Sequence, residues 1–390
     1  MSTSDFDRLS ILDLYCGLGG LSLGFEMTDA YEVVGGIDNY DWAVKTFYDN
    51  HPEIDDTQFN KPIDLSSVAA GEIRTALTDT PDVVVGGPPC QGWSDAGKRY
   101  EDYKKDDRNS EVFNFLSVIK SVQPKAFVME NVAGISRTGQ SSRNQILERL
   151  KEDYEQSGYA VTYRVLDSSE YRVPQTRKRL FMVGIRDADT PFRFPDVPCS
   201  DNTELFSGGE PKRTVGDALS DLPTPVDDEP QDYEDDPNTS LQRFLRGNSN
   251  ELHNHLVTNH QKKTVEKISQ QEVGTTLHDW NHSWYRLDPK KPSPTIKHNN
   301  RAPAVHHEEH RIISPRECCR LQTIPDWVEL KGTKTAQLKL VGNAVPSILA
   351  AHLATAIAKQ AFGISVPSPW SSRECPFIHE ETTESDKAFG

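Results

Sequence analysis

The sequence predicts an α/β fold built around a largely parallel sheet. Short apolar runs, which are typical of buried strands, alternate along the first half of the chain with segments that have helical spacing. Glycine-rich or proline-rich turns follow several of these runs, at the position where open α/β sheets bind their ligands. The length of 390 residues allows one large domain with an insertion, or two domains.

The predicted elements of the first half follow in order. A strand over 9–14 leads through a glycine-rich turn into the helix-like run LSLGFEM, and a second strand over 31–37 precedes a helix over 41–50. A further helical pattern covers 111–121. The remaining strand patterns lie at 81–86, 125–130, 159–166 and 179–185.

The pattern changes near residue 190. The segment 188–305 is rich in Pro, Ser, Gly and acidic residues and includes the run VDDEPQDYEDDPN, so we expect an irregular, loop-rich second domain. Regular spacing returns at 314–324, which begins like a capped helix, and at 344–362, the clearest amphipathic helix of the chain. The tail from about 364 lacks periodicity, and we expect it to be an extension.

Composition excludes several classes of protein. No apolar run approaches the roughly 18 residues of a membrane span, and residues 1–10 lack the basic start and apolar core of a secretory signal. The six cysteines form no CxxC pair and no disulfide-scaffold rhythm, so we expect a soluble, intracellular protein with reduced thiols. Acidic residues outnumber basic ones by 59 to 43, and the net charge of −16 argues at first against binding of a polyanion such as DNA.

The first candidate site is the turn after the first strand. Gly17, Gly19 and Gly20 let the backbone approach a ligand closely, and the second strand ends on Asp38, whose carboxylate can accept hydrogen bonds from ribose hydroxyls. This pattern indicates a nucleoside-type site. It is not a GxGxxG fingerprint, and a glycine turn of purely structural use remains the alternative.

The second candidate is Cys90, in the loop PPCQ that follows the strand PDVVVGG. Two prolines stiffen this loop and project the thiol from the sheet edge, where it is placed as a nucleophile. The alternative is a buried apolar cysteine. That alternative fits poorly, because Cys90 does not lie on a periodic apolar face.

Two further candidates follow later strands. Glu130 leaves the strand KAFVME, so we expect it to be partly desolvated, with a raised pKa that suits proton donation. A glutamate at a helix N-terminus is the structural alternative. Arg177 and Arg179, in QTRKR, would point to one side of an extended segment and could bind phosphates or a carbonyl, or else form a solvated basic surface.

In their order along the chain, these motifs resemble the DNA (cytosine-5)-methyltransferase family. The resemblance rests on LDLYCGLGGLSLGFE, GGPPCQGWS, ENV, QTRKR, SPRECCRLQTIP and GNAVP, and covers about 10–190 and 285–360. It implies a Rossmann-like, S-adenosylmethionine-dependent methyltransferase sheet with a smaller target-recognition domain inserted. The expected divisions are a catalytic domain over 1–187, the target-recognition domain over 188–305, a return to the catalytic domain over 306–363, and an extension over 364–390.

The resemblance also implies the reaction and the residues that carry it. A cytosine flipped out of duplex DNA at a specific short sequence would receive the methyl group of S-adenosylmethionine on C5, which leaves S-adenosylhomocysteine. In this scheme Cys90 attacks C6, Glu130 contacts the N3/N4 edge, and Arg179 supports the pyrimidine O2. The catalytic set is Cys90, Glu130, Arg177 and Arg179, and the DNA-binding set is Gln91, Ser94, Lys98 and Arg99, from a mobile loop over 91–108.

The implied cofactor residues lie in five stretches of the chain. Tyr15 and the glycines line the methionine end, Asp38 holds the ribose, and Asp64 holds the adenine amino group. Pro89 packs beside the cofactor, and Asn343 and Val345 close the site. The full set is Asp13, Tyr15, Gly17, Gly19, Gly20, Asp38, Asn39, Asp64, Leu65, Pro89, Asn343 and Val345.

This chain departs from the family pattern at a few positions. Tyr15 stands where phenylalanine is usual, and Cys16 stands where a small residue is common. Asn39 occupies the place of an aromatic residue, with Tyr40 displaced by one position, which puts adenine stacking there in doubt. Thr323 stands where glycine is common.

The histidines at 253, 255, 260, 306, 307 and 310 lack paired cysteines, so we expect no metal site and assign them solvated or DNA-backbone-facing roles. Three alternative functions remain at this point: a tRNA cytosine-5 methyltransferase of the same fold, an inactive DNA-binding module, and a nicotinamide-type dinucleotide enzyme. QGWS and the size of 188–305 favour DNA over tRNA. We expect a monomer on cytoplasmic, nucleoid DNA, with no membrane partner, and leave open a separate restriction endonuclease and the recognised sequence.

Charge is distributed unevenly along the chain. Acidic residues are dense over 227–236, whereas basic residues gather near the predicted site. They are Lys98, Arg99, Lys104, Lys105, Arg108, Arg177, Lys178, Arg179, Lys290, Lys291, Lys297 and Arg301. We therefore expect a basic cleft on an acidic body, which suits a cytoplasm of very high salt because salt screens the repulsion from DNA.

This charge distribution predicts that methyl transfer to DNA persists in molar salt. The measurement is incorporation of labelled methyl groups into DNA as salt is raised, with a thermal melt at each concentration. Loss of folding or of activity as salt rises would contradict the expectation.

Overall fold

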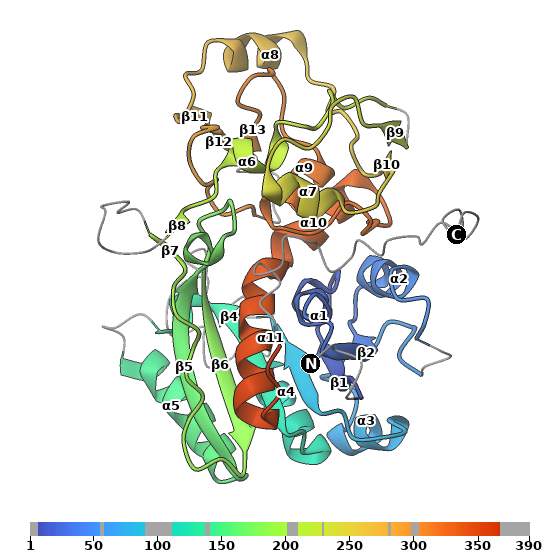
Figure 1. Ribbon diagram of the computed structural model, residues 1–390, viewed down its shortest axis with the longest axis vertical. Coiled ribbons are helices and arrows are strands. Elements are labelled where there is room, and N and C mark those ends of the chain that lie inside the picture. The colour runs from blue at the N-terminus through green and yellow to red at the C-terminus, as the bar shows by residue number, and fades with distance from the viewer. Residues whose placement is uncertain are drawn as a thin grey trace, which may run out of the picture.

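The computed structural model describes residues 7–54, 58–89, 111–136, 141–200, 210–227, 230–279, 282–297 and 304–366. Two lobes are visible in Figure 1: a lower lobe built on a six-stranded sheet, and an upper lobe of short elements. This organisation confirms the predicted α/β fold.

The central sheet has the strand order β2-β1-β3-β4-β6-β5. Its strands are β1 (Leu9–Leu14), β2 (Tyr31–Ile37), β3 (Val83–Gly86), β4 (Ala126–Val132), β5 (Tyr159–Asp167) and β6 (Lys178–Arg186). The neighbours from β2 to β4 are parallel, and β6 is antiparallel to both β4 and β5. The exception has a simple cause, because the ten residues that join β5 to β6 contain only a 3₁₀ turn and no crossover α-helix.

Helices cover both faces of the sheet. Alternate strand residues point to opposite faces, so Ile11 and Val83 belong to one apolar core and Leu12 and Val84 to the other. The first core is completed by α1 (Gly20–Glu26), α2 (Asp41–Asp49) and α11 (Ser347–Phe362). The second is completed by α3 (Ala70–Ala76), α4 (Glu111–Val122) and α5 (Ser141–Glu155). Short 3₁₀ turns follow β4 and β5, at Ala133–Ser136 and Ser168–Tyr171.

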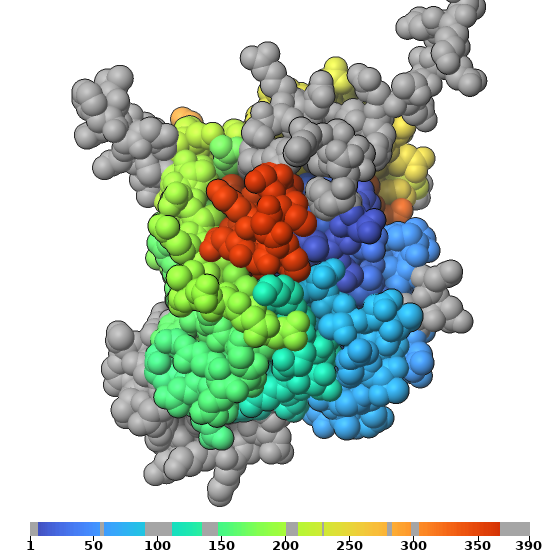
Figure 2. Space-filling model, turned by 60° about the horizontal axis from the view of Figure 1, so that its bottom comes forward, coloured from blue at the N-terminus to red at the C-terminus, as the bar shows by residue number. Residues whose placement is uncertain are grey.

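Helix α11, which follows the upper lobe in the sequence, returns to the lower lobe and packs against α1 (Figure 1). The predicted helix over 344–362 is confirmed from Ser347. Nine of its residues, all between Ser347 and Ala358, are buried, and the less buried positions 352, 355, 356, 359 and 360 recur at helical spacing. Its C-terminal end reaches the surface between the blue N-terminal segment and the green β5–β6 segment in Figure 2. The stretch Lys334–Phe362 is long and apolar enough to cross a membrane, yet 78% of its most apolar window is buried inside the protein, as expected of a core helix.

The packing of α11 against α1 depends on a glycine. A Cβ atom added to Gly24 of α1 would lie 2.3 Å from the Ser347 carbonyl oxygen and 2.4 Å from the Ala350 Cβ atom. Only glycine therefore allows the two helix backbones to approach this closely.

The upper lobe consists of short elements, as the irregular composition of 188–305 predicts (Figure 1). Its helices are α6 (Val215–Leu219), α7 (Ser240–Arg246), α8 (Lys262–Ser269), α9 (Pro315–Leu321) and α10 (Lys334–Asn343). The strand pairs β9 (Gln231–Asp232) with β10 (Glu251–Leu252), and β11 (Thr276–Asp279) with β12 (His282–Arg286) and β13 (Ala304–Val305), complete it. The pair β7 (Cys199–Ser200) and β8 (Glu210–Pro211) lies near its junction with the lower lobe.

Of the segment 306–363, only α11 lies along the sheet. Helix α9 packs against α6, and α10 packs against α9.

A buried charge cluster joins α9 to α6. The fully buried Arg320 forms ion pairs with Asp221 at 3.0 Å and with Asp326 at 2.5 Å. Tyr233 donates a hydrogen bond of 2.7 Å to the same Asp326. Burial alone would raise the pKa of Asp326, but Arg320 lowers it below its usual value, so the cluster stays ionised.

The glycine contact predicts a stability difference between two equivalent substitutions. Gly24→Ala should lower the free energy of unfolding by about 1–3 kcal/mol, because the new methyl group has no space. Gly71→Ala is the matched control, since an added Cβ atom on this residue of α3 meets nothing within 4 Å. Thermal melts of both variants test this expectation, and equal melting temperatures would contradict it.

Candidate active site

The loop after β1 forms the centre of the candidate site. Tyr15, Gly17 and Gly19 have φ angles of 59°, 58° and 88°, in the left-handed region. The Gly17 backbone N–H donates to Asp38 Oδ2 at 3.0 Å, and the Tyr40 N–H donates to Asp38 Oδ1 at 2.9 Å. The structure therefore brings the glycine turn and Asp38 together at the carboxyl ends of β1 and β2, as the sequence predicts.

The segment 343–345, just before α11, contacts the other side of this loop. A Cβ atom added to Gly20 would lie 2.4 Å from the Val345 carbonyl oxygen, so these two predicted residues are in direct backbone contact. Asn343, two residues earlier, is exposed at the end of α10. Residues more than 300 positions apart in the sequence thus meet at one site.

Asp64 lies beside Asp38. The Ile63 N–H donates to the Asp38 carbonyl at 2.8 Å, which fixes the backbone that carries Asp64. Asp64 itself is exposed and accepts a 2.7 Å hydrogen bond from the Ser66 hydroxyl, whereas Leu65 is buried. Two carboxylates therefore face this part of the site.

Asp13 occupies a different place from the other carboxylates. It is buried beneath the loop and accepts a hydrogen bond of 2.8 Å from the Ser22 hydroxyl, which ties β1 to α1. Burial raises the pKa of Asp13 to about 7, and burial also raises the pKa of Asp38. The geometry makes Asp13 a support of the loop.

One face of the Tyr40 ring is already occupied by a lysine side chain, so that face is not open for stacking. The Lys339 ammonium lies 3.7 Å from the Tyr40 ring centroid, a cation–π contact. Asn39 is exposed. Lys339 therefore covers one face of Tyr40, the aromatic residue next to position 39 in the sequence.

Glu130 lies near the end of β4, which pairs with β3, and is buried. Its Oε1 atom forms an ion pair with Arg179 Nε at 3.0 Å but makes no hydrogen bond within the described residues. Burial raises the pKa of Glu130, and the charges of Arg179 and Arg177 oppose that rise. The predicted desolvation is confirmed.

The exit of β3 lies against Glu130. A Cβ atom on Gly87 would be 3.3 Å from Glu130 Oε2, and the Asn131 side-chain amide donates to the Pro88 carbonyl at 3.2 Å. Asn131 is a supporting residue that sequence reasoning did not single out, although the ENV motif contains it. Pro89 is exposed and is the last described residue of this loop.

Arg177 and Arg179 have different partners. Arg177 is buried and donates hydrogen bonds of 3.1 Å to the carbonyls of Ile296 and Gly342. Burial and the neighbouring Arg179 lower the pKa of Arg177 to about 9. Arg177 thus joins three distant segments, and Arg179 is the arginine that pairs with Glu130. Neither arginine belongs to a solvated basic surface of the kind considered as the alternative.

The remaining predicted residues fall in the segment 90–110. Cys90, Gln91, Ser94, Lys98 and Arg99, with the loop predicted over 91–108, lie outside the described residues. Their roles stay predictions. The described chain resumes at Glu111, the first residue of α4.

The expectation of solvated histidines is wrong for three of them. His255, His306 and His307 are buried. His255 contacts the Ser314 hydroxyl at 2.8 Å and the Pro223 carbonyl at 2.7 Å, so it holds loops together. Burial lowers the pKa of His306 to about 4. No group of three metal-ligating side chains occurs among the residues that the structure describes.

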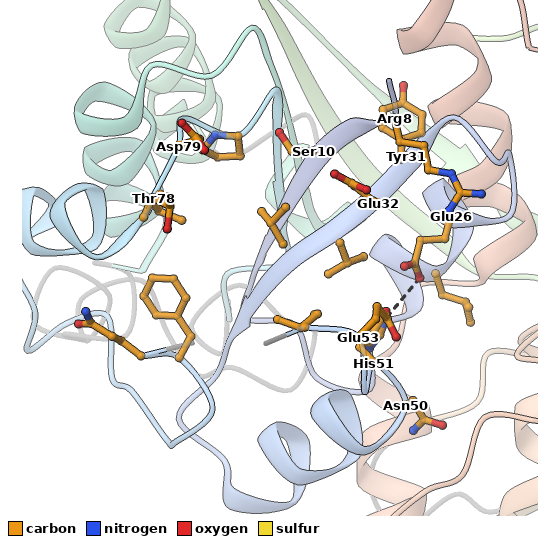
Figure 3. A pocket seen from close by; sticks show the side chains of 18 of the residues that line it. Arg8, Ser10, Glu26, Tyr31, Glu32, Asn50, His51, Glu53, Thr78 and Asp79 are labelled. Carbon is orange, nitrogen blue, oxygen red and sulfur yellow. Dashed lines mark hydrogen bonds and ion pairs between the residues drawn. The ribbon is translucent and has the colours of Figure 1, made fainter. Parts of the chain in front are cut away.

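A separate hollow of about 1020 Å³ lies at the opposite end of β1 and β2 (Figure 3). Arg8, Ser10 and Tyr31 line it, and an ion pair of 3.2 Å joins His51 to Glu26 in its wall. None of the predicted site residues lines this hollow. The candidate site is therefore the carboxyl edge of the sheet and not this hollow.

The fold and the site together define an α/β methyltransferase. A family model of the C-5 cytosine-specific DNA methylases matches residues 9–359, and the chain belongs to that family. It is therefore a transferase that methylates cytosine in DNA. The family and the fold imply an S-adenosylmethionine cofactor.

Similar proteins agree with this assignment. The Type II methyltransferase M.DdeI of Desulfomicrobium norvegicum is 30% identical, with 90% of this chain and 88% of that protein covered. M1.HphI of Haemophilus parahaemolyticus, also a Type II methyltransferase, is 31% identical, with 90% and 87% covered.

Solved structures also match. A protein described as a DNA modification methyltransferase encoded within an E. coli prophage has a TM-score of 0.72 and 26% identity, with 90% of this chain and 99% of that chain covered. The S. pombe Dnmt2 methyltransferase, at a TM-score of 0.56, 17% identity and coverage of 90% and 99%, shows likeness of fold alone.

Proposed function

We propose that this chain methylates C5 of one cytosine within a short specific sequence of duplex DNA, with Cys90 as the nucleophile. The observation that carries the proposal is the Glu130–Arg179 pair beside Gly87. Gly87 follows β3 and precedes Cys90 by three residues. The pair therefore lies on the same sheet edge as the Asp38 loop.

The chemistry requires groups of this kind. C5 of cytosine is too weak a nucleophile to accept a methyl group unaided. Addition of the Cys90 thiolate to C6 makes C5 enamine-like, and a hydrogen bond from Glu130 to N3 disperses the developing negative charge. After methyl transfer, a base removes the C5 proton and the thiolate leaves C6 by β-elimination. Water can serve as that base.

The buried Glu130 suits this role. Its raised pKa favours the protonated form, which can donate to N3, and its pairing with Arg179 fixes the direction of the carboxyl group. Arg179 in turn can donate to the pyrimidine O2. In this proposal Arg177, which is bonded to backbone carbonyls, positions the segment that carries Arg179.

The residues around the Gly17–Gly20 loop would hold S-adenosylmethionine, which supplies an electrophilic methyl sulfonium. Asp38 and Asp64 fit such a ligand, because carboxylates accept hydrogen bonds from a ribose diol and an adenine amino group and favour a cation. Val345, which contacts Gly20, would bound this site from the C-terminal side.

The DNA substrate imposes two further requirements. A stacked cytosine cannot reach a thiol at the sheet edge, so the base must leave the helix, which costs a few kcal/mol. Sequence recognition needs side chains in the major groove, and we assign it to 188–305. We further propose a monomer that acts on cytoplasmic, nucleoid DNA, with any cognate restriction endonuclease acting as a separate protein.

The nucleophile assignment predicts the result of one substitution. Cys90→Ser should abolish methyl transfer while S-adenosylhomocysteine still binds, because a hydroxyl is a far weaker nucleophile than a thiolate. DNA with 5-fluorocytosine at the target should trap wild-type enzyme as a covalent adduct, because fluorine blocks loss of a proton from C5. The same assay compares duplex DNA with tRNA as acceptors of the methyl group, which tests the tRNA alternative. Activity in Cys90→Ser, or no adduct with active wild-type enzyme, would contradict the mechanism.

The assignment of 188–305 to recognition predicts the outcome of a segment exchange. When this segment is replaced by the equivalent segment of a relative, the methylated sequence should change to that of the relative. Mapping of 5-methylcytosine across the genome of a methylation-free host measures the target. An unchanged target in an active chimaera would reject the boundary.

A further inference from the structure

Tyr15 makes a contact that the proposed chemistry does not use. Its hydroxyl donates a hydrogen bond of 2.8 Å to Glu111 Oε2 and lies 3.3 Å from the Glu111 carbonyl oxygen. Glu111 is the first residue of α4, which follows β3 in the sequence, whereas the loop that carries Tyr15 precedes β3. The pair therefore joins the loop after β1 to the helix that begins directly after residues 90–110.

The backbone of Tyr15 needs such a restraint. Its φ angle of 59° lies in the left-handed region, which is unfavourable for a residue with a large side chain. A residue persists there only where its surroundings hold it. The hydrogen bond to Glu111 fixes the ring, and the next glycine, Gly17, binds Asp38 through its backbone N–H.

Tyr15 lies at the wall of the proposed cofactor cleft. It is half-buried, with Asp64 close enough to influence its charge. Burial and the bond to Glu111 raise the pKa of the Tyr15 hydroxyl, so it remains a hydrogen-bond donor. Asn114 also donates to Glu111 Oε2, at 3.3 Å, and holds the carboxylate from within α4.

We propose that Glu111 is a positioning residue for the cofactor: its carboxylate holds the Tyr15 hydroxyl, and so keeps the aromatic ring and the Gly17 backbone in the geometry that binds S-adenosylmethionine. This inference rests on the proposed function. It assigns to this chain a polar contact, Tyr15 with Glu111, beside the loop whose Gly17 binds Asp38.

A simpler role for Glu111 would be to stabilise α4 alone, since a carboxylate in the first helical turn interacts favourably with the helix dipole. That role changes the melting temperature but not the affinity for cofactor. The two roles therefore differ in a binding measurement.

The test is calorimetric titration of S-adenosylhomocysteine into Tyr15→Phe, Glu111→Leu and the double variant. Each single change should weaken binding about five- to tenfold, because a hydrogen bond to a charged group is lost. The double variant should lose little more than either single one, since both remove the same bond. Glu111→Gln keeps an acceptor oxygen and should restore most of the affinity.

A matched control is available in the same sheet. Tyr163 of β5 donates a 2.7 Å hydrogen bond to Glu148 of α5, on an exposed part of the surface away from the cleft. Tyr163→Phe and Glu148→Leu should leave binding of S-adenosylhomocysteine unchanged. The KM for S-adenosylmethionine should rise in the Tyr15 and Glu111 variants, with the KM for DNA unaltered.

The outcomes separate the inference from the proposed function. If wild-type protein binds no S-adenosylhomocysteine, the proposed function fails. If wild-type protein binds and the Tyr15 and Glu111 variants bind equally well, with at most a lower melting temperature, the positioning role is rejected. Should Glu111→Leu fail to fold, Tyr15→Phe and Glu111→Gln still decide the question.

Discussion

The close contact between α1 and α11 is the constraint on which the rest of the structure depends. Gly20 and Gly24 allow the backbone of α1 to touch Val345 and Ser347, at distances that no other residue permits. This contact completes one core of the sheet and closes the loop that holds Asp38. Without it, Val345 would not meet the glycine loop at the candidate cofactor site.

Electrostatics divide the carboxyl edge of the sheet into two parts. Carboxylates gather at the ends of β1 and β2, where burial raises the pKa of Asp38 and of the supporting Asp13. At the end of β4, Glu130 instead faces Arg179, and Arg177 lies behind it. One part suits a cationic ligand and the other suits a polar heterocycle. Because β1 to β4 are parallel, their carboxyl ends lie at one edge of the sheet, and the two parts of the site therefore lie close together.

The net charge of −16 says little about this edge. Several charged side chains are buried in the upper lobe, where Arg320 forms ion pairs with Asp221 and Asp326. Such a cluster holds its geometry because removal of one member leaves an unpaired buried charge. It joins α6 to α9, two elements that lie about a hundred residues apart in the sequence, and so makes the upper lobe a unit. Composition alone cannot show which charges are paired in this way.

The sequence by itself determined the alternation of strands and helices, the glycine turn before Asp38 and the desolvation of Glu130, because apolar periodicity and strand-end position are local properties. Tertiary structure alone decided that β6 runs antiparallel, that Arg177 is buried against Ile296 and Gly342, and that His255, His306 and His307 are buried. It also decided that α11 packs against α1 and that Tyr15 binds Glu111. These features depend on which distant segments meet, and a local pattern carries no information about a partner that lies a hundred or more residues away.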